Sequence, residues 1–599
     1  MSTAQAARDS VVGPNQVSAN VERRELTNAE IGRILREISI LLDMQAVPFK
    51  PRAYEKAADA VDHVEQSLAE LFRQGGRKAI EKVPGVGKSI AEKIATLIES
   101  GRLPFYDELH AKTPVDLAGL TAVEGLGPKH IRLLYEELGV RTLAELEEAG
   151  RDGRIRSLAG FGEKSEQRIL RGIEFLKQTS GRFPLDSALR VVEEIAERLR
   201  AMPEVERASV AGSIRRRQET IGDGDIVVVS AYADAVMERF AAMPEVMHIH
   251  GKGSTKSSVK LRSGMDVDLR VVPAESWGAA LLYFTGSKAH NVALRRIAVQ
   301  RGLKLNEYGL LQEETSIAGK SEEEVYAALD LPYIPPEMRE DSGEIEAAAH
   351  GELPQLIEYG DLRGDLQTQT DWTDGADSLE DMVAAAERLG HEYIAITDHT
   401  KSLAMMGADE AQLRRQMQVI DALNEKERAI RVLKSAEVNI LRDGTLDIGD
   451  DLLAELDVVG IAVHSHFNLT RAEQTQRIVR AMENPHADIL FHPTGRLLQK
   501  REAYEVDIDA VIAAAKRTGT VLEIDSYPDR LDLKDEHVRK AVAAGVKIAI
   551  DTDAHAVTQL GFLHFGIATA RRGWATKADV VNTRPMAEFL RCLKRGARS

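Results

Sequence analysis

The chain has 599 residues, a formal net charge of −17 and one cysteine, Cys592, and 43% of its residues are hydrophobic. This length exceeds what a single hydrophobic core supports, so we expect three to five domains. One cysteine excludes internal disulfide bonds and cysteine-based zinc clusters, and no apolar run reaches the ~20 residues of a membrane span. The acidic balance excludes a uniformly basic nucleic-acid-binding protein, so any contact with DNA phosphates must be local.

The first part of the chain is predicted to be helical and repetitive. Residues 1–24 are polar and aperiodic, and we expect a disordered leader there. Three related segments follow, Val83–Ile94, Val123–Tyr135 and Leu158–Leu170. Each reads hydrophobic residue, any residue, Gly, hydrophobic residue, Gly, and then a helix with an early lysine. The glycines permit a tight hairpin, and the N–H groups that begin the next helix suit a phosphate.

These repeats resemble the helix-hairpin-helix motif. The resemblance implies a module that binds the DNA backbone without reading base sequence. The DNA-binding candidates are Gly85, Gly87, Lys88, Gly125, Gly127, Lys129, Gly160, Gly162 and Lys164.

The stretch from Gly212 to Val229 carries the clearest chemistry. Asp223 and Asp225 begin an apolar strand and point to the same face, because side chains alternate along a strand. A divalent cation such as Mg²⁺ would remove the repulsion between the two carboxylates. A third carboxylate is expected from Asp266 or Asp268 on a neighbouring strand, and we favour Asp268 because it lies deeper in the apolar pattern.

Four segments of this region resemble family X DNA polymerases: Gly212–Asp225, Tyr283–Asn291, Leu305–Leu310 and Ile334–Glu340. The resemblance implies two Mg²⁺ ions on the catalytic residues Asp223, Asp225 and Asp268. The nucleotide-binding residues that it implies are Gly212, Ser213, Arg216, Gly222, Tyr283, Phe284, Gly286, Asn291 and Arg295.

Two further positions follow from the same resemblance. Family members with lyase activity use a lysine after the first hairpin as a Schiff-base nucleophile, and the alignment falls on Lys93, with Lys82 and Lys88 as nearby alternatives. Lys288 and His290 depart from vertebrate gap-filling relatives, so nucleotide affinity does not carry over from them.

From Gly364 onward, short apolar strands alternate with longer helical stretches, which predicts an α/β barrel of parallel strands. The expected strands are Tyr393–Thr397, Arg431–Leu441, Val458–His464, Ile489–His492, Val521–Asp525 and Lys547–Asp551. Metal-ligand residue types gather at their C-terminal ends, where barrel active sites form. The order resembles the polymerase-and-histidinol-phosphatase (PHP) phosphoesterase domain. It implies Mn²⁺ or Zn²⁺ on Asp374, His399, Glu437, His464, His492, Asp553 and His555.

One motif departs from that domain. Its first motif supplies two histidines, whereas this chain has Gln367 and Gln369 at those positions. A neutral amide oxygen is a weaker ligand than imidazole for Mn²⁺ or Zn²⁺. The resemblance implies a 3′–5′ exonuclease, and we expect its activity to be reduced or absent.

The predicted fold is multidomain: an all-α helix-hairpin-helix N-terminal region, an α+β nucleotidyltransferase palm with an α/β thumb, and a C-terminal α/β PHP barrel. The expected bounds are 25–105 for a first helical domain, 106–181 for a fingers-like domain, 182–274 for the palm, 275–345 for the thumb, 346–360 for a linker, 361–580 for the barrel and 581–599 for a C-terminal tail.

The predicted function is DNA-directed DNA synthesis across short gaps during repair, by two-metal nucleotidyl transfer. Its partners would be gapped or primer–template DNA and dNTPs, with no membrane, and we expect a monomer in the cytoplasm, associated with the nucleoid. A template-independent nucleotidyltransferase, or a PHP phosphoesterase with a DNA-binding front half, are the alternatives that the sequence leaves open.

Overall fold

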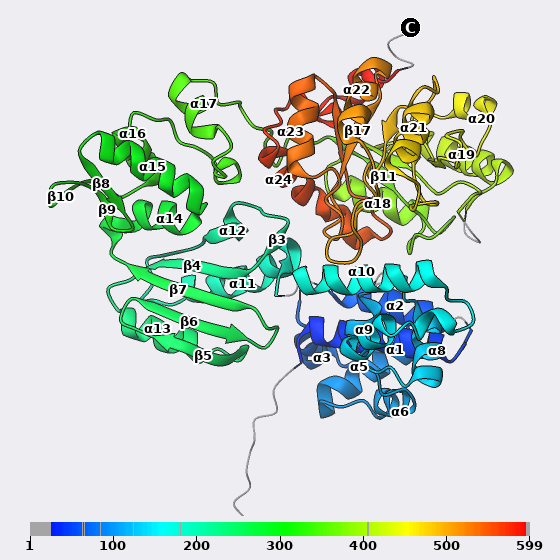
Figure 1. Cartoon of the computed structure of the whole chain (residues 1–599), viewed down its shortest axis with the longest axis horizontal. Coiled ribbons are helices and arrows are strands. Elements are labelled where there is room, and N and C mark those ends of the chain that lie inside the picture. Colours follow the sequence, from blue (N-terminus) through cyan, green and yellow to red (C-terminus); the bar gives the residue numbers. More distant parts are fainter. Residues whose placement is uncertain are drawn as a thin grey trace, which may run out of the picture. The chain divides into compact units, whose positions relative to one another are not determined.

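The computed structural model describes residues 26–594, except 49, 63, 65, 84, 124, 180 and 404–406. The predicted leader, residues 1–24, therefore lies outside the described residues. The chain divides into two compact units, Met1–Thr113 and Pro114–Ser599, which are blue and cyan-to-red in Figure 1. Among the described residues, no helix combines the length and the apolarity that a membrane crossing requires.

The first unit is entirely helical where it is described. Thr27 and Glu30 form a capping box at the start of α1, and Ile31, Leu35 and Ile38 are buried along one face of this helix. The predicted domain boundary at residue 105 falls inside the last helix. The helices are α1 (Asn28–Met44), α2 (Lys50–Asp62), α3 (Leu68–Gly75), α4 (Arg77–Ile80), α5 (Lys88–Ser100) and α6 (Pro104–Lys112).

The three sequence repeats share one backbone geometry. Gly85, Gly125 and Gly160 have φ values of +81°, +83° and +86°, a region that glycine occupies without strain. In each repeat the next residue donates its N–H to the carbonyl two residues before the glycine. The helices of the second unit that precede the palm are α7 (Leu117–Thr121), α8 (Pro128–Leu138), α9 (Leu143–Arg151) and α10 (Glu163–Thr179).

The palm is a five-stranded sheet of order β2-β4-β7-β6-β5, in which β4 and β7 lie side by side and run parallel (Figure 1). The other neighbouring pairs run antiparallel. Ile226 and Val228 face a core that includes α11 and α13, whereas Val227 and Val229 pack against α14. The elements are α11 (Leu185–Arg200), β2 (Arg207–Val210), α12 (Gly212–Arg215), β4 (Asp223–Val229), α13 (Ala233–Ala241), β5 (Val246–Lys252), β6 (Lys256–Leu261) and β7 (Asp266–Val272).

Because side chains alternate along β4, Asp223 and Asp225 lie on the face that α14 covers further along the strand. A two-stranded antiparallel pair, β1 (Phe183–Pro184) and β3 (Thr220–Ile221), flanks this sheet.

The thumb joins helices to a small antiparallel sheet of order β10-β9-β8. The predicted thumb boundary at residue 345 falls inside its last helix, so part of the predicted linker is helical. The elements are α14 (Trp277–Thr285), α15 (Lys288–Gln300), β8 (Leu303–Asn306), β9 (Gly309–Gln312), β10 (Thr315–Ala318), α16 (Glu322–Ala328) and α17 (Glu344–His350).

The C-terminal part contains parallel strands in two sheets, β11-β12-β13 and β14-β15-β16-β17-β18. Two bridges join the sheets, His399 to Glu437 and Thr368 to Ala554, and the N–H of Leu366 on β11 donates to Asp551 on β18. The strands are β11 (Gly364–Thr368), β12 (Tyr393–Ile396), β13 (Arg431–Lys434), β14 (Glu437–Asn439), β15 (Gly460–Ala462), β16 (Ile489–Leu490), β17 (Val521–Asp525) and β18 (Ile548–Asp551).

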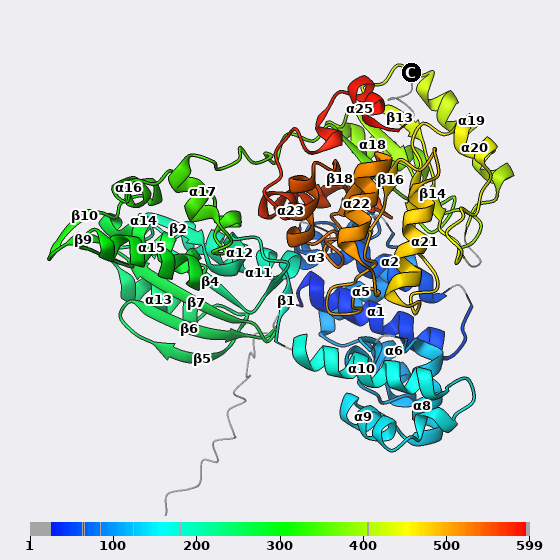
Figure 2. The same ribbon diagram turned by 45° about the horizontal axis from the view of Figure 1, so that its top comes forward.

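Helices surround these strands, and α21, α22 and α23 follow one another along the outside (Figure 2). They are α18 (Leu379–Arg388), α19 (Glu410–Asn424), α20 (Asp450–Glu455), α21 (Arg471–Met482), α22 (Ile508–Thr518), α23 (Asp535–Ala544) and α24 (Leu563–Arg572). The strand predicted over Arg431–Leu441 is two strands, because it breaks between Lys434 and Glu437 as the chain passes from one sheet to the other.

The predicted C-terminal tail, residues 581–599, is ordered in its described part. It contains α25 (Met586–Cys592), and Phe589 on this helix is fully buried. The Phe589 ring stacks on that of Tyr393, with centroids 5.4 Å apart and 5° between the planes. Residues 581–594 therefore pack as part of the barrel.

Candidate active sites

Strand register brings the palm carboxylates together. β4 and β7 pair so that Asp225 lies opposite Asp268 and Asp223 lies opposite Asp266. Burial first, and then the charges of Asp223 and Asp268, raise the pKa of Asp225 to about 7. Three carboxylates thus interact near the N-terminal ends of β4 and β7. All of their donor atoms are oxygens, the donors that a hard divalent cation prefers.

The structure separates the two candidates on β7. Asp266 is about half exposed, and its Oδ1 lies 2.8 Å from Nε2 of His250 and 3.0 Å from Nζ of Lys260. Asp268 instead lies opposite Asp225, and its Oδ2 pairs with Nζ of Lys256 at 2.6 Å. Asp266 is therefore a surface ion-pair residue, and Asp268 is the β7 carboxylate that interacts with Asp225.

A cavity of about 420 Å³ lies beside the carboxylates. Every predicted nucleotide-binding residue except Gly222 lines it, and so does Lys288. At Gly222 an added Cβ would meet only Nη1 of Arg182, at 3.8 Å. The lining residues are Gly212, Ser213, Arg216, Asp223, Asp225, Tyr283, Phe284, Thr285, Gly286, Lys288, Asn291 and Arg295.

Close contacts fix the cavity wall. Gly212 has a φ of +62°, and a Cβ added there would lie 2.1 Å from Oδ2 of Asp225, so only glycine fits. Nη1 of Arg216 donates to the carbonyl of Thr285 at 2.6 Å, and Nδ2 of Asn291 donates to the carbonyl of Tyr283 at 2.7 Å.

Glu340 connects this cavity to the barrel. Its Oε1 accepts hydrogen bonds from Nε of Arg216 at 3.0 Å and from Nε2 of Gln218 at 2.6 Å. Nη1 of Arg572, on α24 of the barrel, donates to the same Oε1 and to the carbonyl of Arg216, both at 2.9 Å. The orientation of Arg216 therefore depends in part on a residue of the barrel.

His290 has a structural environment. It is fully buried, with Nδ1 2.6 Å from Oε1 of Glu344 and Nε2 2.9 Å from the hydroxyl of Tyr326. Nearby, the buried Arg339 donates to Glu322 at 2.6 Å. Burial opposes the ionisation of Glu322, but a hydrogen bond from Arg215 and the charge of Arg339 lower its pKa to about 2.

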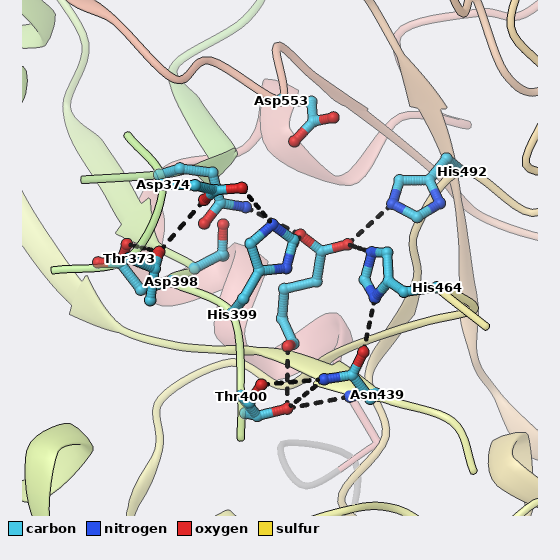
Figure 3. A network of polar contacts seen from close by, with 12 residues as sticks. Thr373, Asp374, Asp398, His399, Thr400, Asn439, His464, His492 and Asp553 are labelled. Carbon is cyan, nitrogen blue, oxygen red and sulfur yellow. Dashed lines mark hydrogen bonds and ion pairs between the residues drawn. The ribbon is translucent and has the colours of Figure 1, made fainter. Parts of the chain in front are cut away.

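A second cluster lies just beyond the C-terminal ends of β12, β15 and β16, where His399, His464 and His492 surround the fully buried Glu437, the first residue of β14. Its Oε1 lies 2.9 Å from Nε2 of His464 and 2.8 Å from Nε2 of His492, and its Oε2 lies 3.4 Å from Nδ1 of His399. Figure 3 shows these three imidazoles converging. Burial opposes ionisation, but the charges of His399 and His464 hold the pKa of Glu437 well below its usual value.

Asp374 lies on the other side of His399. Its Oδ2 is 3.4 Å from Nε2 of His399 and 3.7 Å from Nε2 of His555. Burial works against protonation of His555, yet the charges of Asp553 and Asp374 raise its pKa to about 9. Among the described residues, the ligand atoms of two groups lie within 4.8 Å of one another: Asp374, His399 and His555, and His399, Glu437 and His464. Both donor sets fit a divalent metal ion.

The corner of this site that contains the two glutamines does not fit a metal ion. Gln367 and Gln369 are fully buried, and Nε2 of Gln369 donates to Oε2 of Glu437 at 2.8 Å. Oε1 and Nε2 of Gln367 have no hydrogen-bond partner among the described residues. Asp553 already has a cation beside it, since Nε of Arg530 lies 3.4 Å from its Oδ2.

Comparisons with known proteins cover most of the chain. Four family descriptions apply: a helix-hairpin-helix domain at 26–103, a SAM-like helix-hairpin-helix tandem at 117–174, a DNA polymerase beta thumb at 280–340 and a PHP domain at 365–526. "DNA polymerase/3'-5' exonuclease PolX" of Bacillus subtilis (strain 168) is 38% identical over 572 residues, which cover 94% of this chain and 99% of the relative. The chain belongs to the PHP-containing family X DNA polymerases.

A eukaryotic relative matches a shorter part of this family X polymerase. "DNA polymerase lambda" of Rattus norvegicus is 24% identical over 343 residues, covering 52% of this chain and 56% of the relative. Family X polymerases and PHP domains are metal-dependent, and carboxylate or histidine clusters are present in both the palm and the barrel.

Sequence reasoning missed two residues that contact candidate metal ligands, Asn439 and Lys256. Asn439 accepts a hydrogen bond at its Oδ1 from Nδ1 of His464, at 2.8 Å, and so orients that ring (Figure 3). Lys256 lies on β6, a strand that the sequence analysis did not predict, so nothing in its pattern placed it near Asp268.

Lys93 lies on α5 of the first unit. Its Nζ is 3.1 Å from Oγ of Ser89, 5.9 Å from the ring centroid of Tyr54 and 5.1 Å from that of Phe105. Partial burial lowers the pKa of Lys93. A lowered pKa increases the neutral amine fraction, which is the nucleophilic form.

Proposed function

We propose that this polymerase extends a DNA primer across short gaps by template-directed nucleotidyl transfer. The register of β4 with β7 carries the proposal, because it puts Asp225 opposite Asp268 at the edge of a cavity lined by Ser213 and Arg216. The substrates would be gapped or primer–template DNA and dNTPs. We further propose that the protein acts as a monomer in the cytoplasm, at the nucleoid.

Each cavity residue has a distinct role in this proposal. Ser213 and Arg216 would hold the triphosphate, and Glu340 keeps the Arg216 guanidinium in place. Tyr283, whose ring meets that of Phe284 edge-on with centroids 5.1 Å apart, would line the sugar pocket. Asn291 and Arg295 would face the base and the template strand, and Gly212 leaves room for the Asp225 carboxylate.

Asp223, Asp225 and Asp268 would hold two Mg²⁺ ions. When bound, these ions supply a lowered pKa for the primer 3′-hydroxyl and charge neutralisation at the leaving pyrophosphate. The raised pKa of Asp225 supports this assignment, since a cation stabilises the ionised form that its neighbours disfavour.

The test uses three isosteric variants on β4 and β7. We expect Asp225→Asn and Asp268→Asn to reduce single-nucleotide extension at least ~10³-fold while binding of gapped DNA persists. Asp266→Asn is the matched control, because Asp266 lies two residues away on the same strand but pairs with Lys260 at the surface. If Asp266→Asn loses activity and Asp268→Asn keeps it, the assignment of the third carboxylate is wrong.

The hairpin repeats would hold the DNA backbone around the gap through their glycines and through Lys88, Lys129 and Lys164. Extension on gapped DNA with and without a 5′-phosphate tests this role, and a strong effect of the 5′-phosphate would support gap recognition. Varying one template base separates templated synthesis from template-independent transfer, since only templated synthesis changes its nucleotide preference with that base.

We also propose that the barrel has reduced or absent 3′–5′ exonuclease activity, although the Bacillus subtilis relative is named as an exonuclease. Gln367 and Gln369 replace two imidazole ligands with neutral amides, while Asp374, His399, Glu437, His464, His492 and His555 remain as potential ligands of Mn²⁺ or Zn²⁺. The assay is Mn²⁺-dependent release of a 3′-terminal label. Strong activity that His464→Ala abolishes would contradict the proposal.

Lyase activity on abasic sites is a second candidate function, favoured by the lowered pKa of Lys93. Borohydride reduction would trap a Schiff base between Lys93 and the sugar aldehyde of incised abasic DNA. We expect Lys93→Ala to lose the trapped complex and Lys88→Ala to retain it. Equal trapping in both variants would assign the reaction to another amine.

A further inference from the structure

Arg530 lies among buried carboxylates at the C-terminal ends of the barrel strands β17 and β18. Arg530 follows β17, and its Nε lies 3.2 Å from Oδ2 of Asp525 and 3.4 Å from Oδ2 of Asp553. The Asp525 side chain is fully buried, that of Asp553 is 5% exposed, and that of Arg530 is 22% exposed. One guanidinium therefore interacts with two carboxylates that are almost completely removed from water.

The charge of Arg530 stabilises the ionised forms of both carboxylates, because an unpaired buried charge costs several kcal/mol. In a metal site, a metal ion taken up from solution neutralises the carboxylates, whereas Arg530, a side chain of the protein, does so here. The charge of Arg530 also acts on Glu437, the residue that the barrel histidines surround.

The side-chain amides of Gln367 and Gln369 also indicate a metal site that has lost its ligands. Within the described part of the chain, both side-chain polar atoms of the fully buried Gln367 lack a hydrogen-bond partner, and so does Oε1 of the buried Gln369. Buried polar atoms are normally satisfied, so this corner has the donor positions of a ligand site without ligands of the right chemistry. Asp553 has a left-handed backbone with a φ of +51°, strain of the kind that is typical of a functional site.

We propose that Arg530 permanently takes the place of one divalent cation in the barrel, so that restoring imidazoles at residues 367 and 369 is not sufficient to recover that ion. This proposal rests on the proposed loss of 3′–5′ exonuclease activity in the barrel. It is tested by the metal content of the chain, whereas the loss of activity is tested by a nuclease assay. The two can therefore fail separately.

The experiment counts Mn²⁺ in the full-length chain after loading and desalting, by elemental analysis, in matched variants. The double variant Gln367→His/Gln369→His should hold as many ions as the wild type. Adding Arg530→Met, which removes the charge but keeps a long side chain, should add one ion per chain. Adding Arg530→Lys instead, which keeps the charge, should add none.

Two outcomes would overturn the proposal. One is an additional ion in the double variant with Arg530 intact. The other is no additional ion in the folded triple variant that carries Arg530→Met. If that triple variant does not fold, Arg530→Gln on the same Gln367→His/Gln369→His background takes its place: it should hold one ion more than the double variant, and no additional ion would refute the replacement.

Discussion

A methyl group at residue 212 tests the palm geometry directly. In Gly212→Ala the new Cβ would lie 2.1 Å from Oδ2 of Asp225, and contacts below 3.0 Å are not tolerated, so the carboxylate must move by about 0.9 Å. A displacement of ~1 Å at a catalytic group costs about 10²-fold in rate. We therefore expect kcat for single-nucleotide extension to fall about 10²-fold.

Backbone strain must be separated from this displacement, because residue 212 has a φ of +62° and an alanine there costs ~1–2 kcal/mol by itself. Gly302 is the matched control: its φ is +71°, and an added Cβ meets nothing within 4 Å. Gly302→Ala should lower the unfolding temperature by a few degrees, like Gly212→Ala, but retain kcat within about twofold. Extension by Gly212→Ala within tenfold of the wild type, or an equal loss in Gly302→Ala, would refute the reasoning.

Three further predictions concern contacts away from the carboxylates. Arg572→Ala should raise the dNTP KM about tenfold, because Glu340 loses one of its partners and Glu340 orients Arg216, which is proposed to bind the triphosphate. Arg571→Ala, which breaks contacts with Glu337 and Ile357 instead, should leave KM unchanged in the same steady-state assay. Phe589→Ala should destabilise the barrel by about 3–5 kcal/mol in thermal unfolding, since the ring is fully buried; no loss would show that the C-terminal helix is dispensable. Glu322 has a pKa of about 2 in the folded protein, below its ordinary value of 4.5, so its stabilising effect, about 3 kcal/mol, is present above pH ~4.5 and is lost as the pH falls toward 2. Between pH 5 and 3 the unfolding temperature of the wild type should therefore fall more steeply than that of Glu322→Gln, and parallel curves would contradict this assignment.

Local patterns in the sequence predicted the features that a single strand determines, such as its bounds and which of its side chains lie deeper in it. The strand predicted at Val521–Asp525 is confirmed residue for residue as β17, because a short β-branched run bounded by polar residues determines it locally. The preference for Asp268 over Asp266 also came from strand depth. The register with β4 and the separate partners of Asp266 now give that preference a structural basis.

Features that depend on tertiary packing were not predictable in this way. The tail beyond residue 580 was not assigned to the barrel, because a short amphipathic segment such as Met586–Cys592 does not indicate which surface it packs against. Gln367 and Gln369 could be recognised as a departure from a motif, but Arg530 belongs to no motif and only the fold brings it to Asp553.

Lys256 and Arg530 neutralise, in two different ways, carboxylates that a metal ion could otherwise bind. Lys256 pairs with Asp268 through a flexible side chain that is 41% exposed, so it can move into solvent when a divalent cation arrives. Arg530 is 22% exposed and lies between two buried carboxylates, so its departure would leave both unpaired. A side-chain cation that can move away, such as that of Lys256, leaves the carboxylate free to bind a metal ion. A cation that cannot move away, such as that of Arg530, keeps the metal ion out. On the proposed assignments, the palm retains the electrostatics of a two-metal site, whereas one corner of the barrel would bind no ion even with its histidines restored.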